Sequence, residues 1–163
     1  MGAYTPIMVK SKIDLSTLNK DAVAEGSECM AYNLKKATRA VQNFFDSAYK
    51  SIGLEGTQYT VLAHIFVAEP ITLSRLAESM SVDRTTLGRN LKPLEKKGLI
   101  DIKAGDDRRA KLISITDYGK QILSQALPVW KETHEQIRDL LGIEKWSSIV
   151  TNLKELTKKL NER

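Results

Sequence analysis

The stretch "SVDRTTLGRNLKPLEKKGLIDIKAGDDRRAKLISIT", residues 81–116, decides the fold. Leu87, Leu91 and Leu94 recur at steps of four and three residues, the spacing of one face of an α-helix. Gly98 is a natural stop for that helix. The β-branched or bulky residues Ile100 and Ile102, and then Leu112, Ile113 and Ile115, lie on either side of the polar segment "KAGDDRRAK". The stretch therefore predicts a helix followed by a two-stranded hairpin with an exposed turn.

The same stretch holds the whole excess of positive over negative charge in the chain. From residue 84 to residue 111 there are nine Lys or Arg against four Asp or Glu, and the whole chain has a net charge of +5. The rest of the chain is therefore neutral. A positive excess confined to one short segment is typical of a nucleic-acid-binding surface. A solvated helix face with a charged turn would have the same composition, so charge alone leaves that alternative open.

The residues before this stretch predict three helices. Apolar residues at helical spacing indicate one long amphipathic helix over residues 30–52. We expect Thr57 to cap a second helix, which Pro70 closes, and Thr72 to cap a short third helix. We expect the fourth helix, which carries the basic residues, to start at Ser81.

Two more helices are predicted after the hairpin. Thr116 should cap a long helix that reaches Leu141 and bends at Pro128, and a final helix should cover residues 146–160. The fold class is thus mainly α with a small β-hairpin wing, a winged helix-turn-helix with long N- and C-terminal helices. The apolar stripes of these long helices lie far from the winged core in sequence. Pairing with a second copy of the chain is the simplest way to bury them.

The length and composition of the chain indicate which classes of protein it can belong to. A chain of 163 residues with 42% hydrophobic residues can bury a real core. We expect an N-terminal arm over 1–26, a helical dimerisation region over 27–55 and 117–163, and a winged helix-turn-helix DNA-binding domain over 56–116. The single cysteine cannot form an internal disulfide, which fits a reducing cytoplasm. No window approaches the roughly 18 apolar residues of a membrane helix, so we expect a cytoplasmic protein without a membrane partner.

Four motifs resemble the MarR family of transcriptional regulators. They are "IGLEGTQY" at 52–59, "ITLSRLAESM" at 71–80, "DRTTLGRNLKPLEKKGLI" at 83–100 and "DDRRAKLISIT" at 106–116. The last two, in that order and spacing, are a specific signal, and the likeness extends from about Cys29 to Leu160. The resemblance implies a triangular homodimer whose terminal helices intertwine and whose two winged modules bind one palindromic DNA site.

The fourth helix is expected to enter the major groove of double-stranded DNA. Arg84 and Arg89 can each offer paired donors to a guanine edge. Thr85 and Thr86 can reach phosphates, bases or a thymine methyl group, and Gly88 leaves the backbone room to approach. The alternative is that these side chains only solvate a helix surface.

Further basic residues should position the protein on the duplex. Lys92 and Lys96 are placed to contact phosphates without reading sequence. The resemblance assigns Asp107 and Arg109 to the Asp-x-Arg motif of the wing, in which the acid orients the arginine towards the minor groove. Arg108 adds a second positive group near the tip. The alternative is an ordinary charged turn with a weak exposed ion pair.

Cys29 raises the alternative of a redox-sensing regulator. One branch of the family uses a cysteine near the start of its first long helix. By register from the "TQY" motif, that cysteine would fall at Ala31 and its partner tyrosine at Phe45. The mismatch favours Cys29 as an ordinary small helix residue, and oxidation would also require a reactive, accessible thiol.

The family further suggests a pocket between the winged module and the dimerisation helices. Tyr32, Arg39 and His64 are the candidates to line it, and a small aromatic or phenolic compound is the expected effector. His64 and His134 have no second histidine or cysteine at ligand spacing, so both are interpreted as structural and no metal is predicted.

The chain shows no activated nucleophile, phosphate-binding glycine loop or paired catalytic carboxylates, so neither an enzyme nor a cofactor is predicted. The expected function is a sequence-specific DNA-binding transcriptional regulator. It would be a homodimeric repressor of a palindromic promoter site, relieved by a small-molecule effector. The alternatives are a winged-helix protein-interaction module without specific DNA binding and a redox-sensing regulator that uses Cys29.

Overall fold

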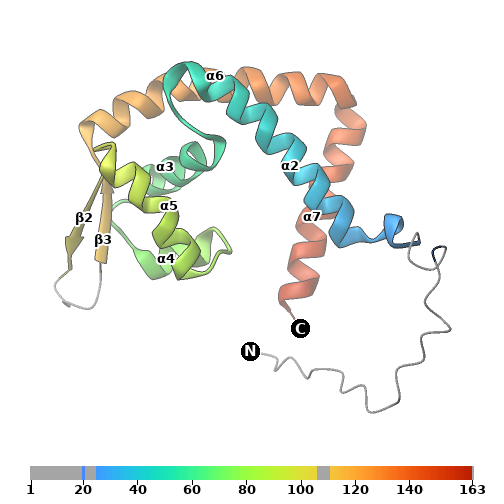
Figure 1. Ribbon diagram of the computed structural model, residues 1–163, viewed down its shortest axis with the longest axis horizontal. Coiled ribbons are helices and arrows are strands. Elements are labelled where there is room, and N and C mark those ends of the chain that lie inside the picture. The colour runs from blue at the N-terminus through green and yellow to red at the C-terminus, as the bar shows by residue number, and fades with distance from the viewer. Residues whose placement is uncertain (1–19, 21–24, 106–110, 163) are drawn as a thin grey trace, which may run out of the picture. The chain divides into compact units, whose positions relative to one another are not determined.

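The computed structural model describes residue 20 and residues 25–105 and 111–162. The chain divides into two compact units, of which one is Ala40–Gln136 and the other consists of the described residues of Met1–Arg39 and Ile137–Arg163. The hydrophobic core lies in the unit Ala40–Gln136. This unit holds the helix-turn-helix and the strands (Figure 1), and it therefore positions the candidate site.

The order of elements confirms the predicted fold class. The described elements are η2 Glu25–Glu28, α2 Met30–Tyr49, η3 Lys50–Ile52, α3 Gly56–Ala68, β1 Ile71–Thr72, α4 Leu73–Ser79, α5 Arg84–Lys96, β2 Ile100–Ala104, β3 Lys111–Ile115, α6 Asp117–Leu141 and α7 Ile143–Asn161. The predicted helices and hairpin are all present, and α5 and α6 continue through Pro93 and Pro128. The expected first helix tightens into the 3₁₀ turn η3 at its end.

The strands form a small antiparallel sheet in the order β1-β3-β2. Ile113 is fully buried at its centre and pairs with Ile71 of β1 on one side and Ile102 of β2 on the other. Ile100 pairs with Ile115 at the base of the hairpin. The sequence predicted β2 and β3 but not β1, because two residues are too few to show an alternating pattern.

The start of α3 differs from the prediction. Thr57 does not cap this helix, which begins at Gly56 and has Glu55 at the cap position without a side-chain bond. The backbone N–H of Gly56 instead donates to the carboxylate of Asp46, at 2.6 Å. A side chain from α2 thus satisfies one of the free donors at the start of α3.

The start of α5 also differs from the prediction. Ser81 does not begin the helix: its φ of 52° lies in the left-handed region, and it belongs to the turn after α4. Asp83 is the cap, and its carboxylate accepts from the backbone N–H of Thr86 at 2.9 Å and from the Thr86 hydroxyl at 2.5 Å. These bonds lower the pKa of Asp83, with the side-chain bond from Thr86 as the largest cause. Gly98, with a φ of 68°, follows the end of the helix as expected.

The other two predicted caps are confirmed. Thr72 accepts from the N–H of Arg75 at the start of α4, at 3.3 Å. Thr116 accepts from the N–H of Gly119 at 2.9 Å, and its hydroxyl donates to the carbonyl of Gly98 at 2.7 Å. Thr116 therefore starts α6 and also ties the end of the hairpin to the residues that precede it.

The unit of Met1–Arg39 and Ile137–Arg163 is different in character, because its helix α7 has no buried residue. Large apolar side chains stay in contact with water there: Leu140 is 85% exposed, Ile143 64% and Leu160 59%. None of the helices within the described ranges combines the length and apolar character needed to cross a membrane.

Candidate nucleic-acid interface

Helix α5 separates an apolar face from a basic face. Leu87, Leu91 and Leu94 are at most 2% exposed and pack into the core of the unit Ala40–Gln136. With 3.6 residues per turn, Arg89 and Lys92 project from the opposite side of the helix, and both are exposed. The cationic side chains are thus presented to solvent by the same packing that fixes the helix.

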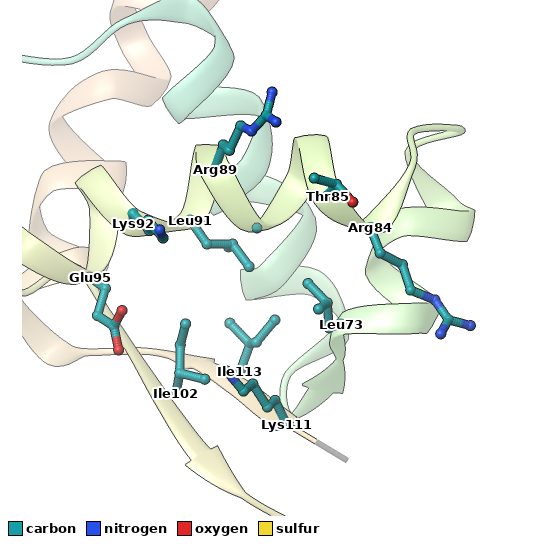
Figure 2. Close-up of a pocket in the computed structure, with 11 residues that line it drawn as sticks. Leu73, Arg84, Thr85, Arg89, Leu91, Lys92, Glu95, Ile102, Lys111 and Ile113 are labelled. Atoms are coloured by element: carbon teal, nitrogen blue, oxygen red, sulfur yellow. The ribbon is translucent and has the colours of Figure 1, made fainter. Parts of the chain in front are cut away.

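A groove of about 360 Å³ lies between α5 and the sheet. Its lining consists of an apolar floor and a largely cationic rim: Leu73, Arg84, Thr85, Gly88, Arg89, Leu91, Lys92, Glu95, Ile102, Lys111 and Ile113. Figure 2 shows Leu91 of α5 facing Ile102 and Ile113 of the sheet. The guanidinium groups of Arg84 and Arg89 extend away from this floor (Figure 2). The groove therefore joins the helix and the hairpin into one surface.

The cationic side chains of this groove form no ion pair with any residue that the structure describes. This holds for Arg84, Arg89 and Lys92 of α5 and for Lys111 of β3. Glu95 is the one carboxylate in the described lining. Uncompensated positive charge beside a concave surface attracts polyanions and raises their local concentration.

Five of the predicted DNA-contacting residues meet at this groove. Arg84, Thr85, Gly88, Arg89 and Lys92 all line it. The sequence also placed Thr86 in this set, but its hydroxyl proton is engaged by the capping carboxylate. The capping bond leaves the methyl group and the oxygen lone pairs of that side chain for further contacts.

Sequence reasoning did not single out the residues that complete or support the groove. Lys111 and Glu95 belong to the lining. By sequence Lys111 is only one of nine basic residues and falls in the predicted exposed turn, whereas the structure places it at the start of β3. Lys97 donates to the carbonyl of Gly53 at 2.8 Å and to the side-chain oxygen of Gln58 at 2.9 Å. Gln58 is 7% exposed. These bonds fasten the end of α5 to the turn that precedes α3.

The base of the hairpin is fixed by Glu69, which follows α3. Its carboxylate accepts from the backbone N–H of Ile115 at 2.9 Å and lies 3.1 Å from the ammonium group of Lys120. The predicted wing residues Asp107, Arg108 and Arg109 lie outside the described residues. The structure thus positions the two strands that carry the wing.

A second cavity, of about 490 Å³, lies in the same unit. Its described lining is neutral: Val41, Gln42, Phe45, Tyr49, Gly56, Thr57, Tyr59, Thr60, Val61, Met80, Val82, Asn90 and Trp130. Asn90 belongs to α5, and Met80 and Val82 belong to the turn before it. This cavity therefore borders the helix that carries the basic face.

The predicted effector residues are not brought together in this cavity. Tyr32 and Arg39 are exposed on α2 in the part that belongs to the other unit. His64 is half-buried on α3, and its Nδ1–H donates to the carbonyl of Thr60 at 2.8 Å. None of the three lines the 490 Å³ cavity. The spacing of residues in the sequence does not predict this cavity, because its lining residues come from four separate segments: α2, α3, residues 80–90 and α6.

Two further predicted positions can be placed in the fold. Cys29 is exposed as a free cysteine directly before α2. His134 lies on α6 with its ring centroid 5.0 Å from that of Trp130. In the ranges that the structure describes, no three His, Cys, Asp or Glu side chains gather where they could hold a metal ion.

A helix-turn-helix whose second helix carries a basic face beside a β-hairpin defines the class of winged helix-turn-helix proteins. The sequence model of the MarR family matches residues 54–111. The transcriptional regulator MosR of M. tuberculosis, in complex with DNA, is 32% identical and has a TM-score of 0.76, with 83% of this chain and 98% of that chain covered. This chain belongs to the MarR family.

Two further relatives extend the comparison. An uncharacterized HTH-type transcriptional regulator of Bacillus cereus is 38% identical over 79 residues, 48% of this chain. The match spans about half the length of that relative, 52%. BpsR of Bordetella bronchiseptica, whose DNA binding is regulated by 6-hydroxynicotinic acid, is 18% identical with a TM-score of 0.73, covering 81% of this chain and 96% of that chain. At this identity the likeness to BpsR shows the fold.

Proposed function

We propose that this chain is a sequence-specific DNA-binding transcriptional regulator that acts as a homodimeric repressor of a palindromic promoter site. The observation that carries the proposal is the basic face of α5 beside the hairpin, whose cations form no ion pair with any described residue. Membership of the MarR family and the DNA complex of MosR support it. The family and the fold are those of transcriptional regulators and not of enzymes.

In this proposal α5 reads base edges in the major groove. Arg84 and Arg89 are exposed, and each guanidinium can donate two hydrogen bonds to one guanine. Thr85 lies between them on the helix, where its methyl group can contact a thymine. A Cβ added at Gly88 would meet nothing within 4 Å, so this position is open for close approach of the duplex.

Other cations set the register without reading sequence. Lys92, Lys96 and Lys111 are exposed and can contact phosphates on the flanks of the major groove. We propose that Arg109, oriented by Asp107, enters the adjacent minor groove, and that Arg108 contacts the backbone beside it. A narrow minor groove favours an arginine because it concentrates negative potential.

The homodimer is supported by the apolar surface that a single chain leaves exposed. Residues 56–116 would form the DNA-binding domain, and residues 27–55 and 117–163 the dimerisation region. Ile149 and Leu153 lie one helical turn apart on α7 and are 45% and 41% exposed, so a second copy could cover both. Two winged modules in one dimer would then bind half-sites roughly 34–36 Å apart.

Release by an effector is supported by the 490 Å³ cavity. Asn90 lies directly after Arg89 on α5 and lines this cavity, as do Met80 and Val82 of the preceding turn. A ligand that binds more tightly to one orientation of α5 shifts the population towards that orientation. A shift of the two recognition helices away from the spacing of the half-sites would weaken DNA binding.

The test is fluorescence anisotropy of labelled DNA from the region upstream of the coding sequence. We expect saturable binding that weakens steeply as salt rises. Arg84→Ala should cost about 1–3 kcal/mol and relax the preference at one base position. Lys145→Ala, which removes one exposed charge from α7, is the matched control and should keep that preference. Weak, non-saturating binding without preference for a palindrome would instead indicate a protein-interaction module.

A further inference from the structure

The carboxylate of Asp83 and the hydroxyl of Thr86 lie together at the start of α5. Asp83 directly precedes Arg84 and Thr85, which line the groove between α5 and the sheet. Both Asp83 and Thr86 are exposed, and Asp83 forms no ion pair with any described residue. The first residues of a recognition helix are those that contact base edges in the major groove. Under the proposed function, on which this inference rests, the pair is therefore within reach of the bases.

The bonds within this pair determine which of its atoms can donate. The Thr86 hydroxyl donates its proton to Oδ2 of Asp83 at 2.5 Å, and Oδ1 accepts from the backbone N–H of Thr86 at 2.9 Å. The side-chain bond, followed by the backbone bond, lowers the pKa of Asp83, so its carboxylate is ionised at neutral pH. An ionised carboxylate has no proton to donate, and a hydroxyl has only one. The pair thus presents only lone pairs to a duplex.

Capping of α5 does not require the charge of Asp83. Asn and Ser cap helices about as well as Asp does, and they are neutral. Beside the cations of Arg84 and Arg89, a carboxylate repels the phosphates that those cations attract. It also loses hydration when the duplex approaches, unless a donor of the duplex replaces the lost water. Asp83 is therefore unfavourable for binding to any duplex that does not offer it a donor.

The major-groove edges of the bases differ in what they offer to such a pair. Cytosine presents the donor N4 amino group and no acceptor, whereas guanine and thymine present acceptors and adenine has an acceptor beside its amino group. We propose that Asp83 and Thr86 together select a cytosine in each half-site, with Asp83 holding the Thr86 hydroxyl as an acceptor. This preference complements that of Arg84 and Arg89, which can only donate and which suit guanine.

Fluorescence anisotropy with the full chain tests the proposal. The parent first selects a palindromic site from a pool of random duplexes, and every base pair of one half-site is then replaced in turn. Replacing C·G by U·A puts the O4 acceptor of uracil where the amino group was, without adding a methyl group. At one position we expect this change to weaken binding of the parent at least about tenfold.

Two substitutions should reduce that loss at the same position. Asp83→Asn still caps the helix, but its amide gives the pair a proton to donate, so the loss should shrink to about threefold or less. Thr86→Val removes the accepting oxygen and keeps the shape of the side chain, and it should shrink the loss as well. Thermal midpoints close to that of the parent would show that both variants fold.

Glu95→Gln is the matched control, because it also removes one exposed carboxylate from α5. Both Glu95→Gln and Asp83→Asn should bind random duplexes more tightly than the parent, since each removes a charge that repels phosphates. Only Asp83→Asn should lose the preference for cytosine. A residue that acted purely as a helix cap would change neither result.

The outcomes separate this inference from the proposed function. If the parent prefers a palindrome and Asp83→Asn keeps every base preference, this inference fails and the proposed function stands. A uniform loss of affinity for all duplexes in Asp83→Asn would also overturn the inference, because a disturbed helix start weakens all contacts alike. A parent that binds every duplex equally well would refute the proposed function itself.

Discussion

At the scale of single residues, Gly119 shows how closely the wing packs on the helix that follows it. A Cβ at Gly119 would collide with the carbonyl oxygen of Leu99 and would lie 2.7 Å from Cγ1 of Ile115. The backbone is not free to move aside, because Thr116 in the same turn bonds both to Gly119 and to Gly98. Gly119→Ala should therefore lower the free energy of unfolding by about 1–3 kcal/mol, measured by urea denaturation.

Gly88→Ala is the matched control for this prediction. A Cβ there meets nothing within 4 Å, and alanine favours a helix interior by up to about 1 kcal/mol over glycine. We expect its stability to equal or exceed that of the parent, while affinity for DNA falls if the backbone of α5 approaches the duplex at this point. An equal loss of stability in both variants would contradict the collision at Gly119.

Asp83 should make stability depend on pH in the acidic range. The bonds from Thr86 lower the pKa of Asp83 in the folded state below that of the unfolded chain, which is about 3.9. The stabilisation is therefore complete above about pH 4 and is lost as pH falls through the folded pKa. Asp83→Asn keeps a capping side chain but does not titrate. We expect the unfolding free energy of the parent to decline more than that of this variant on acidification, and parallel curves would contradict the assignment.

At the scale of elements, local patterns could be predicted and distant partners could not. Leu87, Leu91 and Leu94 showed their shared face directly, and Thr72 and Thr116 were recognised as caps because the bonded groups lie within three residues. The prediction was wrong at the start of α5, where Ser81 and Asp83 are both residue types that can cap a helix. It was also wrong at the start of α3, where the backbone N–H of Gly56 bonds to Asp46, ten residues earlier in another helix.

In the candidate site, too, the features within one segment could be predicted, and those that join distant segments could not. The cations of α5 could be predicted because charge and helical period coincide in one segment, as Arg84 and Arg89 show. The neutral cavity could not, because its rings come from α2, α3 and α6 and meet only on folding. The bond between Lys97 and Gln58 spans 39 residues, so the local pattern around Lys97 does not indicate its partner.

The two adjacent lysines should therefore respond differently to substitution. Lys97→Met removes the donor to Gly53 and Gln58 and leaves a buried amide oxygen unpaired, so unfolding free energy should fall by about 1–3 kcal/mol. Lys96→Met loses no bond among the described residues and should keep its stability. The affinity of Lys96→Met for DNA should be lower than that of the parent, and it should depend less steeply on salt concentration. Urea denaturation measures the structural role of Lys97, and fluorescence anisotropy measures the DNA-contacting role of Lys96. Equal losses of stability in the two variants would contradict these separate roles.

At the scale of the whole molecule, burial is distributed unevenly. The core residues all lie in the unit Ala40–Gln136, whereas α7 buries none of its side chains. An apolar helix face gains free energy when it leaves water, at roughly 25 cal/mol per Å². A single chain obtains little of this gain from α7. A second copy with the same exposed face offers the complementary surface that a twofold assembly requires.

Substitution on α7 tests this assembly. Leu153→Glu places a charge on the exposed apolar face, and burying that charge in an interface would be unfavourable. Light scattering should give a mass close to the 18.3 kDa of one chain for this variant and twice that mass for the parent. Thr151→Glu introduces the same charge nearly opposite on the helix and should keep the parent mass. Affinity for a palindromic duplex should fall only for Leu153→Glu, because two linked modules bind more tightly than one. A parent mass of 18.3 kDa would refute the dimer.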